Sequence, residues 1–84
     1  MSRKDVPDRL VCLAYLEYRG MYLRGENAKW PYEFLSKWTG EPNKVCYRAM
    51  ERACDRGYIE YGVSLRSGWV TKKGLELVAE GTVL

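Results

Sequence analysis

The chain has 84 residues, of which 46% are apolar, and a formal net charge of +3 at pH 7. A chain of this length forms a single domain that buries about 60% of its unfolded surface or slightly more. No apolar run approaches the roughly 20 residues that a membrane-spanning helix needs, and residues 1–8 carry charges where a secretory signal would be apolar. We therefore expect one cytoplasmic domain, residues 1–84, with no membrane partner.

Cysteine and histidine usage argues against a metal site and against an enzyme. The three cysteines, Cys12, Cys46 and Cys54, have no C-x-x-C spacing, and histidine is absent. A structural zinc ion needs about four Cys or His ligands, and histidine is the commonest general base. We expect no metal, no cofactor and no catalytic activity. Cys12 and Cys46 are interpreted as small buried hydrophobic residues.

Residues 1–7 predict a short N-terminal arm, and residues 7–20 predict a helix that Gly20 ends. Apolar residues lie on two opposite sides of this helix. A helix of this kind is buried on more than one side. In so small a domain, the second side is a candidate contact with another subunit. The stripe assigned to that dimer contact consists of Val11, Tyr15, Tyr18 and Tyr22.

Two further helices follow, over residues 31–39 and 42–56. Pro42 suits the first turn of the third helix, and Gly57 can adopt the left-handed conformation that ends it. The small side chains of this helix recur at the 3–4 spacing of a buried face. They are Cys46, Ala49, Met50 and Ala53. Because only Gly40 and Glu41 separate the two helices, the segment predicts a helix-turn-helix.

After Gly57 the pattern alternates, which predicts a hairpin over residues 58–71 with its loop between Gly62 and Gly68. Leu65 in this loop is interpreted either as an exposed residue or as an anchor for a protein partner. Thr71 can cap a last helix over residues 72–80, which we expect to bury Leu75 and Val78. We find no internal repeat and no linker.

Three motifs in this order resemble winged-helix regulators of the MarR and PadR families. They are Thr39-Gly40, Gly57-Tyr58-Ile59 and Val70-Thr71-Lys72-Lys73-Gly74-Leu75-Glu76-Leu77. The resemblance covers residues 35–78. It implies an α+β fold, a winged helix-turn-helix with a three-helix core, a β-hairpin wing and a short C-terminal helix, in the small form found in phage and accessory regulators.

The resemblance also implies a sequence-specific transcriptional regulator that reads the major groove of double-stranded DNA with residues 42–56 and contacts the backbone with the wing. Asn43 suits an adenine edge, and Lys44 or Arg48 suits guanine. Tyr47 could contact a phosphate or a thymine methyl group. Lys37 and Arg52 suit phosphates. Arg66 is expected to follow the backbone or enter the minor groove, together with Arg3 and Lys4 of the arm.

The charge distribution favours this interpretation. Residues 42–73 hold seven basic and three acidic residues, whereas the rest of the chain holds seven basic and eight acidic ones. The positive excess therefore lies around the proposed reading helix, where a nucleic-acid surface would need it. The corresponding location is the cytoplasm, at the nucleoid.

Two alternatives stay open at this stage. A winged helix can serve as a protein–protein interaction module, for example in a viral or phage protein that binds a host complex, because a fold does not fix a function. Glu41 and Glu51 on the presented face and the aromatic residues of the first helix favour that reading. The other alternative is an architectural DNA-binding accessory of recombination.

Overall fold

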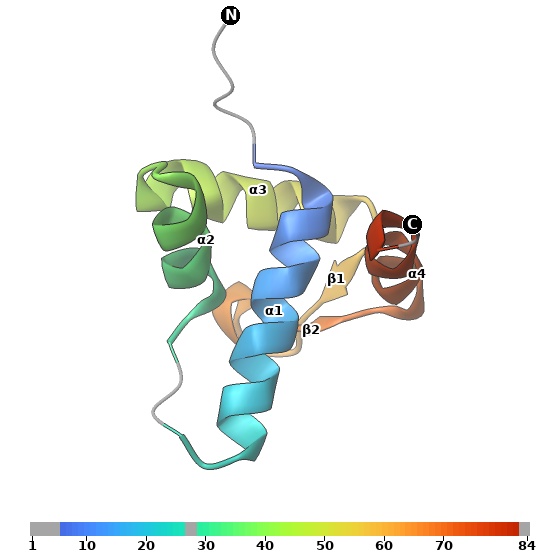
Figure 1. Ribbon diagram of the computed structural model, residues 1–84, viewed down its shortest axis with the longest axis horizontal. Helices are drawn as coiled ribbons and strands as arrows, with labels where there is room; N and C mark the ends of the chain where they lie inside the picture. Colours follow the sequence, from blue (N-terminus) through green and yellow to red (C-terminus); the bar gives the residue numbers. More distant parts are fainter. Residues whose placement is uncertain (1–5, 27–28, 83–84) are drawn as a thin grey trace, which may run out of the picture.

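The computed structural model describes residues 6–26 and 29–82, which form an α+β fold of four α-helices and one two-stranded antiparallel hairpin (Figure 1). The elements are α1 (Asp8–Leu23), α2 (Pro31–Thr39), α3 (Asn43–Asp55), β1 (Ile59–Glu60), the 3-10 turn η1 (Leu65–Ser67), β2 (Trp69–Val70) and α4 (Lys72–Thr82). The predicted order of elements is confirmed. The expected N-terminal arm, with Arg3 and Lys4, lies outside the described residues.

Helix α1 crosses the middle of the molecule and packs against α2, α3, α4 and β2 (Figure 1). It does not end at Gly20, as predicted, but at Leu23. The N–H of Arg24 donates to the carbonyl oxygen of Gly20 and that of Gly25 to the carbonyl oxygen of Tyr22, and Gly25 adopts a φ of 74°. The left-handed glycine that marks the end of the helix is therefore Gly25.

The predicted dimer stripe of α1 is wrong for three of its four residues. Val11, Tyr15 and Tyr18 are buried inside this single chain, beneath the neighbouring helices and the hairpin. Only Tyr22, on the last turn, is exposed. Helix α1 is apolar on several sides because four elements of its own domain surround it, so its pattern requires no second subunit.

Helix α2 and the turn that follows it match the prediction. The side chain of Glu33 accepts the N–H of Trp30 at 3.0 Å, which caps the start of α2. Gly40 has a φ of 79°, and the hydroxyl of Ser36 donates to the carbonyl oxygen of Glu41 at 2.8 Å. The polar groups of the turn are thus satisfied locally, which fixes the angle at which α3 leaves α2.

Helix α3 begins one residue later and ends one residue earlier than predicted. Pro42 occupies the extended N-cap position, not the first turn, and Gly57 ends the helix with a φ of 84°, as predicted. The predicted buried face is confirmed: Cys46, Ala49, Met50 and Ala53 are all in the core. The opposite face is consequently turned outward.

The hairpin is shorter than predicted, with paired residues Ile59↔Val70 and Glu60↔Trp69. Leu65 is buried and belongs to the core, so neither of the two readings of this residue holds. The exposed apolar residue of the loop is Val63, with 97% of its surface accessible. The loop therefore folds back onto the domain at Leu65 and projects at Val63.

The start of α4 shows why Gly74 follows Thr71 by three residues. The hydroxyl of Thr71 accepts the N–H of Gly74 at 3.1 Å, which caps α4 as predicted. A Cβ at Gly74 would lie 2.4 Å from the carbonyl oxygen of Tyr58 and 2.6 Å from Val70. Only glycine permits this close approach of α4 to the hairpin.

The buried face of α4 differs from the prediction. Leu75 is 48% exposed, whereas Leu77 and Val78 pack against the core. The helix is also longer than predicted, reaching Thr82. Leu75 faces outward because the contact at Gly74 sets the rotation of the helix, which no periodicity within α4 could fix.

Candidate nucleic-acid interface

The outward face of α3 has two edges with opposite charge. One edge carries basic residues at every fourth position, and the other carries carboxylates beside the hairpin loop. The basic edge consists of Lys44, Arg48, Arg52 and Arg56, and the carboxylates are Glu51 and Asp55. Residues four apart lie on one side of a helix, so these two series follow α3 side by side.

The N-terminal half of α3 brings three of the predicted DNA-binding residues together. Asn43, Lys44 and Tyr47 line a shallow cavity of about 410 Å³, together with Tyr32 of α2 and Ser64 of the hairpin loop. We call this the polar cavity. Its rim carries amide, ammonium, phenol and hydroxyl groups. These are groups that bond phosphate oxygens and base edges.

Tyr32 and Ser64 were missed by the sequence analysis. The rings of Tyr32 and Tyr47 lie with their centroids 6.2 Å apart and tilted by 59°, a separation typical of interacting aromatic pairs. This contact holds Tyr47 at the edge of α3. No local pattern could have indicated either residue, because the crossing of α2 and the return of the loop bring them to α3.

Arg48 and Lys37 lie outside the polar cavity but are exposed. Within the described part of the chain neither makes an ion pair. Their charges are therefore available to an external anion. The backbone of Arg66 lies in η1, whereas its side chain is outside the described residues, so its predicted contact with DNA stays a prediction.

Arg52 makes contacts within the chain, and its predicted phosphate contact stays a prediction. Its Nη2 donates to the carbonyl oxygen of Val6 at 2.5 Å, and its Nε lies 3.7 Å from the carboxylate of Asp8. Arg56 binds the same carboxylate at 2.7 Å. These contacts fix the start of α1 to the C-terminal half of α3. The basic edge thus has two parts: Lys44 and Arg48 make no ion pair with a described residue, whereas Arg52 and Arg56 bind the start of α1.

The thiol groups offer no reactive nucleophile. Burial and the charge of Asp8 raise the pKa of Cys12 to about 11. Burial, Asp55 and Glu60 raise the pKa of Cys54, and burial also raises that of Cys46. All three thiols therefore stay protonated near neutral pH. The described residues also contain no group of three or more His, Cys, Asp or Glu side chains placed to hold a metal ion.

Within residues 6–26 and 29–82, no helix combines the length and the apolar character needed to cross a membrane. Comparison with protein-family models, with curated proteins and with solved structures finds no match for this chain.

Proposed function

We propose that this chain is a small winged-helix domain that binds double-stranded DNA sequence-specifically and regulates transcription. In this proposal α2 and α3 form the helix-turn-helix, α3 is the recognition helix, and the hairpin from β1 to β2 is the wing. The observation that carries the proposal is the exposed group Asn43, Lys44 and Arg48 on the first turns of α3. These turns are the part of a recognition helix that meets base edges.

Each side chain has a defined role in the proposed complex. Asn43 would bond an adenine edge, and Lys44 or Arg48 would bond O6 and N7 of guanine, each good pair contributing about 1–3 kcal/mol of discrimination. Tyr47 would contact a phosphate or a thymine methyl group. Lys37, exposed on α2, would hold a phosphate and so fix the register without reading sequence.

The acidic residues of α3 limit the footprint. Glu51 and Asp55 are exposed on the last two turns, where they would repel phosphates. Arg52 and Arg56 of the same turns are bound to the start of α1. The proposed contact therefore involves the first two turns of α3, with α2 on one side and the loop at Ser64 on the other.

Fluorescence anisotropy with a random-sequence duplex at low salt tests the proposal. We expect micromolar or tighter binding that weakens as salt rises, because each neutralised phosphate releases counterions. A sequence selected from a random duplex pool should then bind more tightly than the random duplex. Absence of both random and selected binding would exclude DNA as the partner.

Substitutions then locate the reading face. On the selected sequence, Lys44→Ala and Arg48→Ala should each weaken binding by about 1–3 kcal/mol and relax specificity. Arg24→Ala is the matched control, since it removes one positive charge at the end of α1 remote from α3 (Figure 1). Equal effects of all three variants would show that only net charge matters.

A second candidate function, a protein-interaction module, is favoured by one observation. Three apolar or aromatic side chains of the hairpin are exposed, namely Tyr61, Val63 and Trp69. Exposed apolar groups of this kind mark many protein-binding surfaces. In that case Val63→Asp should abolish partner binding, whereas Lys44→Ala should leave it unchanged.

A further inference from the structure

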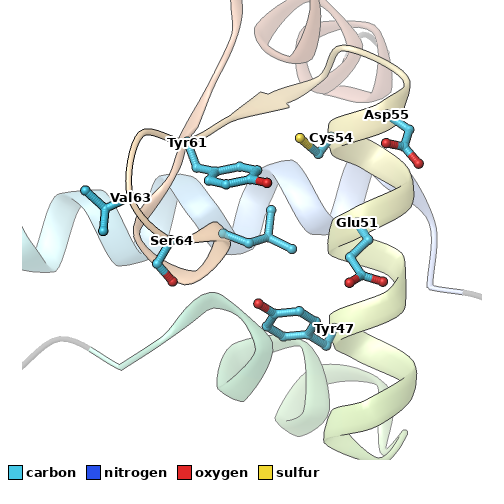
Figure 2. Close-up of a pocket in the computed structure, with 8 residues that line it drawn as sticks. Tyr47, Glu51, Cys54, Asp55, Tyr61, Val63 and Ser64 are labelled. Carbon is cyan, nitrogen blue, oxygen red and sulfur yellow. The ribbon is translucent and has the colours of Figure 1, made fainter.

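A second and larger cavity lies between α3, from Tyr47 onward, and the hairpin loop (Figure 2). Its volume is about 570 Å³, within the range of small-molecule sites. We call it the acidic cavity. Its lining residues are Tyr47, Glu51, Cys54, Asp55, Tyr61, Val63, Ser64 and Leu65. It is formed by α3 and by the loop that follows β1, which folds back toward the helix.

The lining of the acidic cavity combines aromatic rings with an apolar side chain. Figure 2 shows the rings of Tyr47 and Tyr61 on two sides of the cavity, with the Glu51 carboxylate projecting from α3 at a level between them. Leu65, which is largely buried, also lines this space. A planar or alkyl group could therefore lie between the two phenol rings and over the leucine.

Among the described side chains that line the cavity, the charged ones are all acidic. Both ionisable carboxylates, Glu51 and Asp55, are exposed, and neither forms an ion pair with a described residue. None of the described side chains that line the cavity is basic. Anionic ligands are thus disfavoured here, whereas a cation would gain from the carboxylates and from the negative faces of the aromatic rings.

We propose that the acidic cavity binds an organic cation, a primary ammonium or guanidinium group attached to a small apolar body. The cationic group pairs with Glu51, with Asp55 at the rim, and the apolar body lies between Tyr47 and Tyr61 over Leu65. The hydroxyls of Ser64 and of the two tyrosines supply hydrogen-bond acceptors for the remaining N–H groups. This proposal does not depend on DNA binding.

Titration of the ¹⁵N-labelled protein with benzamidine, followed by amide chemical shifts, tests the site. We expect saturable shifts centred on residues 47–55 and 61–65, with a Kd on the order of 1 mM for so small a probe. Benzamide, which has the same shape without the charge, should bind at least about fivefold more weakly. Equal affinity of the two probes, or shifts centred elsewhere, would overturn the proposal.

Substitutions show which of the carboxylates binds the cationic group. Glu51→Gln should weaken benzamidine binding about fivefold, and the double variant Glu51→Gln/Asp55→Asn more strongly. Glu17→Gln is the matched control, because it removes one exposed carboxylate from α1. Both target residues are exposed, so the variants should fold, and their amide spectra verify this directly. Unchanged affinity in the folded double variant would contradict the assignment.

A second titration, with a peptide as the probe, distinguishes two sources of the same cationic group. Acetyl-Gly-Arg-Gly-amide carries an alkyl guanidinium like that of a partner protein, whereas benzamidine represents a free aromatic amidine. Tighter binding of the peptide would assign the site to an arginine side chain of a partner. Tighter binding of benzamidine would assign it to a small molecule. Absence of binding by both probes would refute the site.

Discussion

The hydroxyl of Tyr15 donates a hydrogen bond to the carbonyl oxygen of Leu65 over 2.5 Å, joining two residues that are 50 positions apart in the chain. Tyr15 lies in the middle of α1 and has no accessible surface. The contact fixes the hairpin loop to the core at the point where the loop passes α3. Both cavities beside α3 have a wall formed by this loop, so both depend on that hydrogen bond.

Removal of this hydroxyl should destabilise the fold. Tyr15→Phe leaves the carbonyl of Leu65 buried without its partner, and we expect the free energy of unfolding to fall by about 1–3 kcal/mol. Urea denaturation followed by tryptophan fluorescence measures this change. Tyr22→Phe, on an exposed ring, should stay within about 0.5 kcal/mol of the parent protein. A Tyr15→Phe protein of unchanged stability would show that the loop is held by other contacts.

Two glycines inside helices should respond to alanine in opposite directions. At Gly74 the new methyl group would meet the carbonyl oxygen of Tyr58 at 2.4 Å, which α4 can relieve only by moving away from the hairpin. At Gly20 the nearest atom is the flexible end of Arg24, at 3.2 Å. We expect Gly74→Ala to lower the melting temperature, and Gly20→Ala to stabilise by about 0.5–1 kcal/mol. Stabilisation by Gly74→Ala would contradict the described packing of α4.

Arg52 should matter for stability and not for base recognition. Arg52→Ala removes the guanidinium group that donates to the carbonyl oxygen of Val6 and lies beside the carboxylate of Asp8. We expect the free energy of unfolding to fall by about 1.5–3 kcal/mol. If DNA binds, the sequence preference selected with this variant should equal that of the parent protein. Altered preference at one base position would instead place Arg52 at the DNA.

Stability should fall in alkaline solution, partly through Cys12. Its pKa is about 11 in the folded chain and 9.0 in its ordinary environment, so the unfolded chain loses the proton first. The stabilising contribution is complete below pH 9 and is lost as the pH rises toward 11. Between about pH 8 and about pH 10 the free energy of unfolding should fall by roughly 1 kcal/mol through Cys12.

Cys12→Ala provides the comparison for the alkaline transition. The substitution removes the titrating thiol, so the unfolding free energy of the variant should decline less between the two pH values, whatever its absolute stability. Burial also raises the pKa of Tyr15 far above its ordinary value, so part of the decline should persist in the variant. Identical slopes in the two proteins would exclude a contribution from Cys12.

Local signals in the sequence were sufficient for the order of the helices, for the ends of α2 and for the buried face of α3. The left-handed glycines Gly40 and Gly57 and the cap at Thr71 act within a few residues, so their consequences are visible in the chain itself. The exposed turn with Asn43, Lys44 and Arg48 follows from the same periodicity. Gly20 misled the prediction because one glycine inside a helix costs only about 1 kcal/mol, and the left-handed glycine follows five residues later, at Gly25.

The sequence by itself determined the order of the elements, the helix ends governed by local caps and the polar side of α3, because these depend on neighbouring residues and on a 3.6-residue period. Only the tertiary structure decided what each surface meets. It buried Val11, Tyr15, Tyr18 and Leu65, engaged Arg52 with the start of α1, and formed the polar and acidic cavities. These outcomes depend on contacts between segments up to 50 residues apart, which carry no signature in either segment alone.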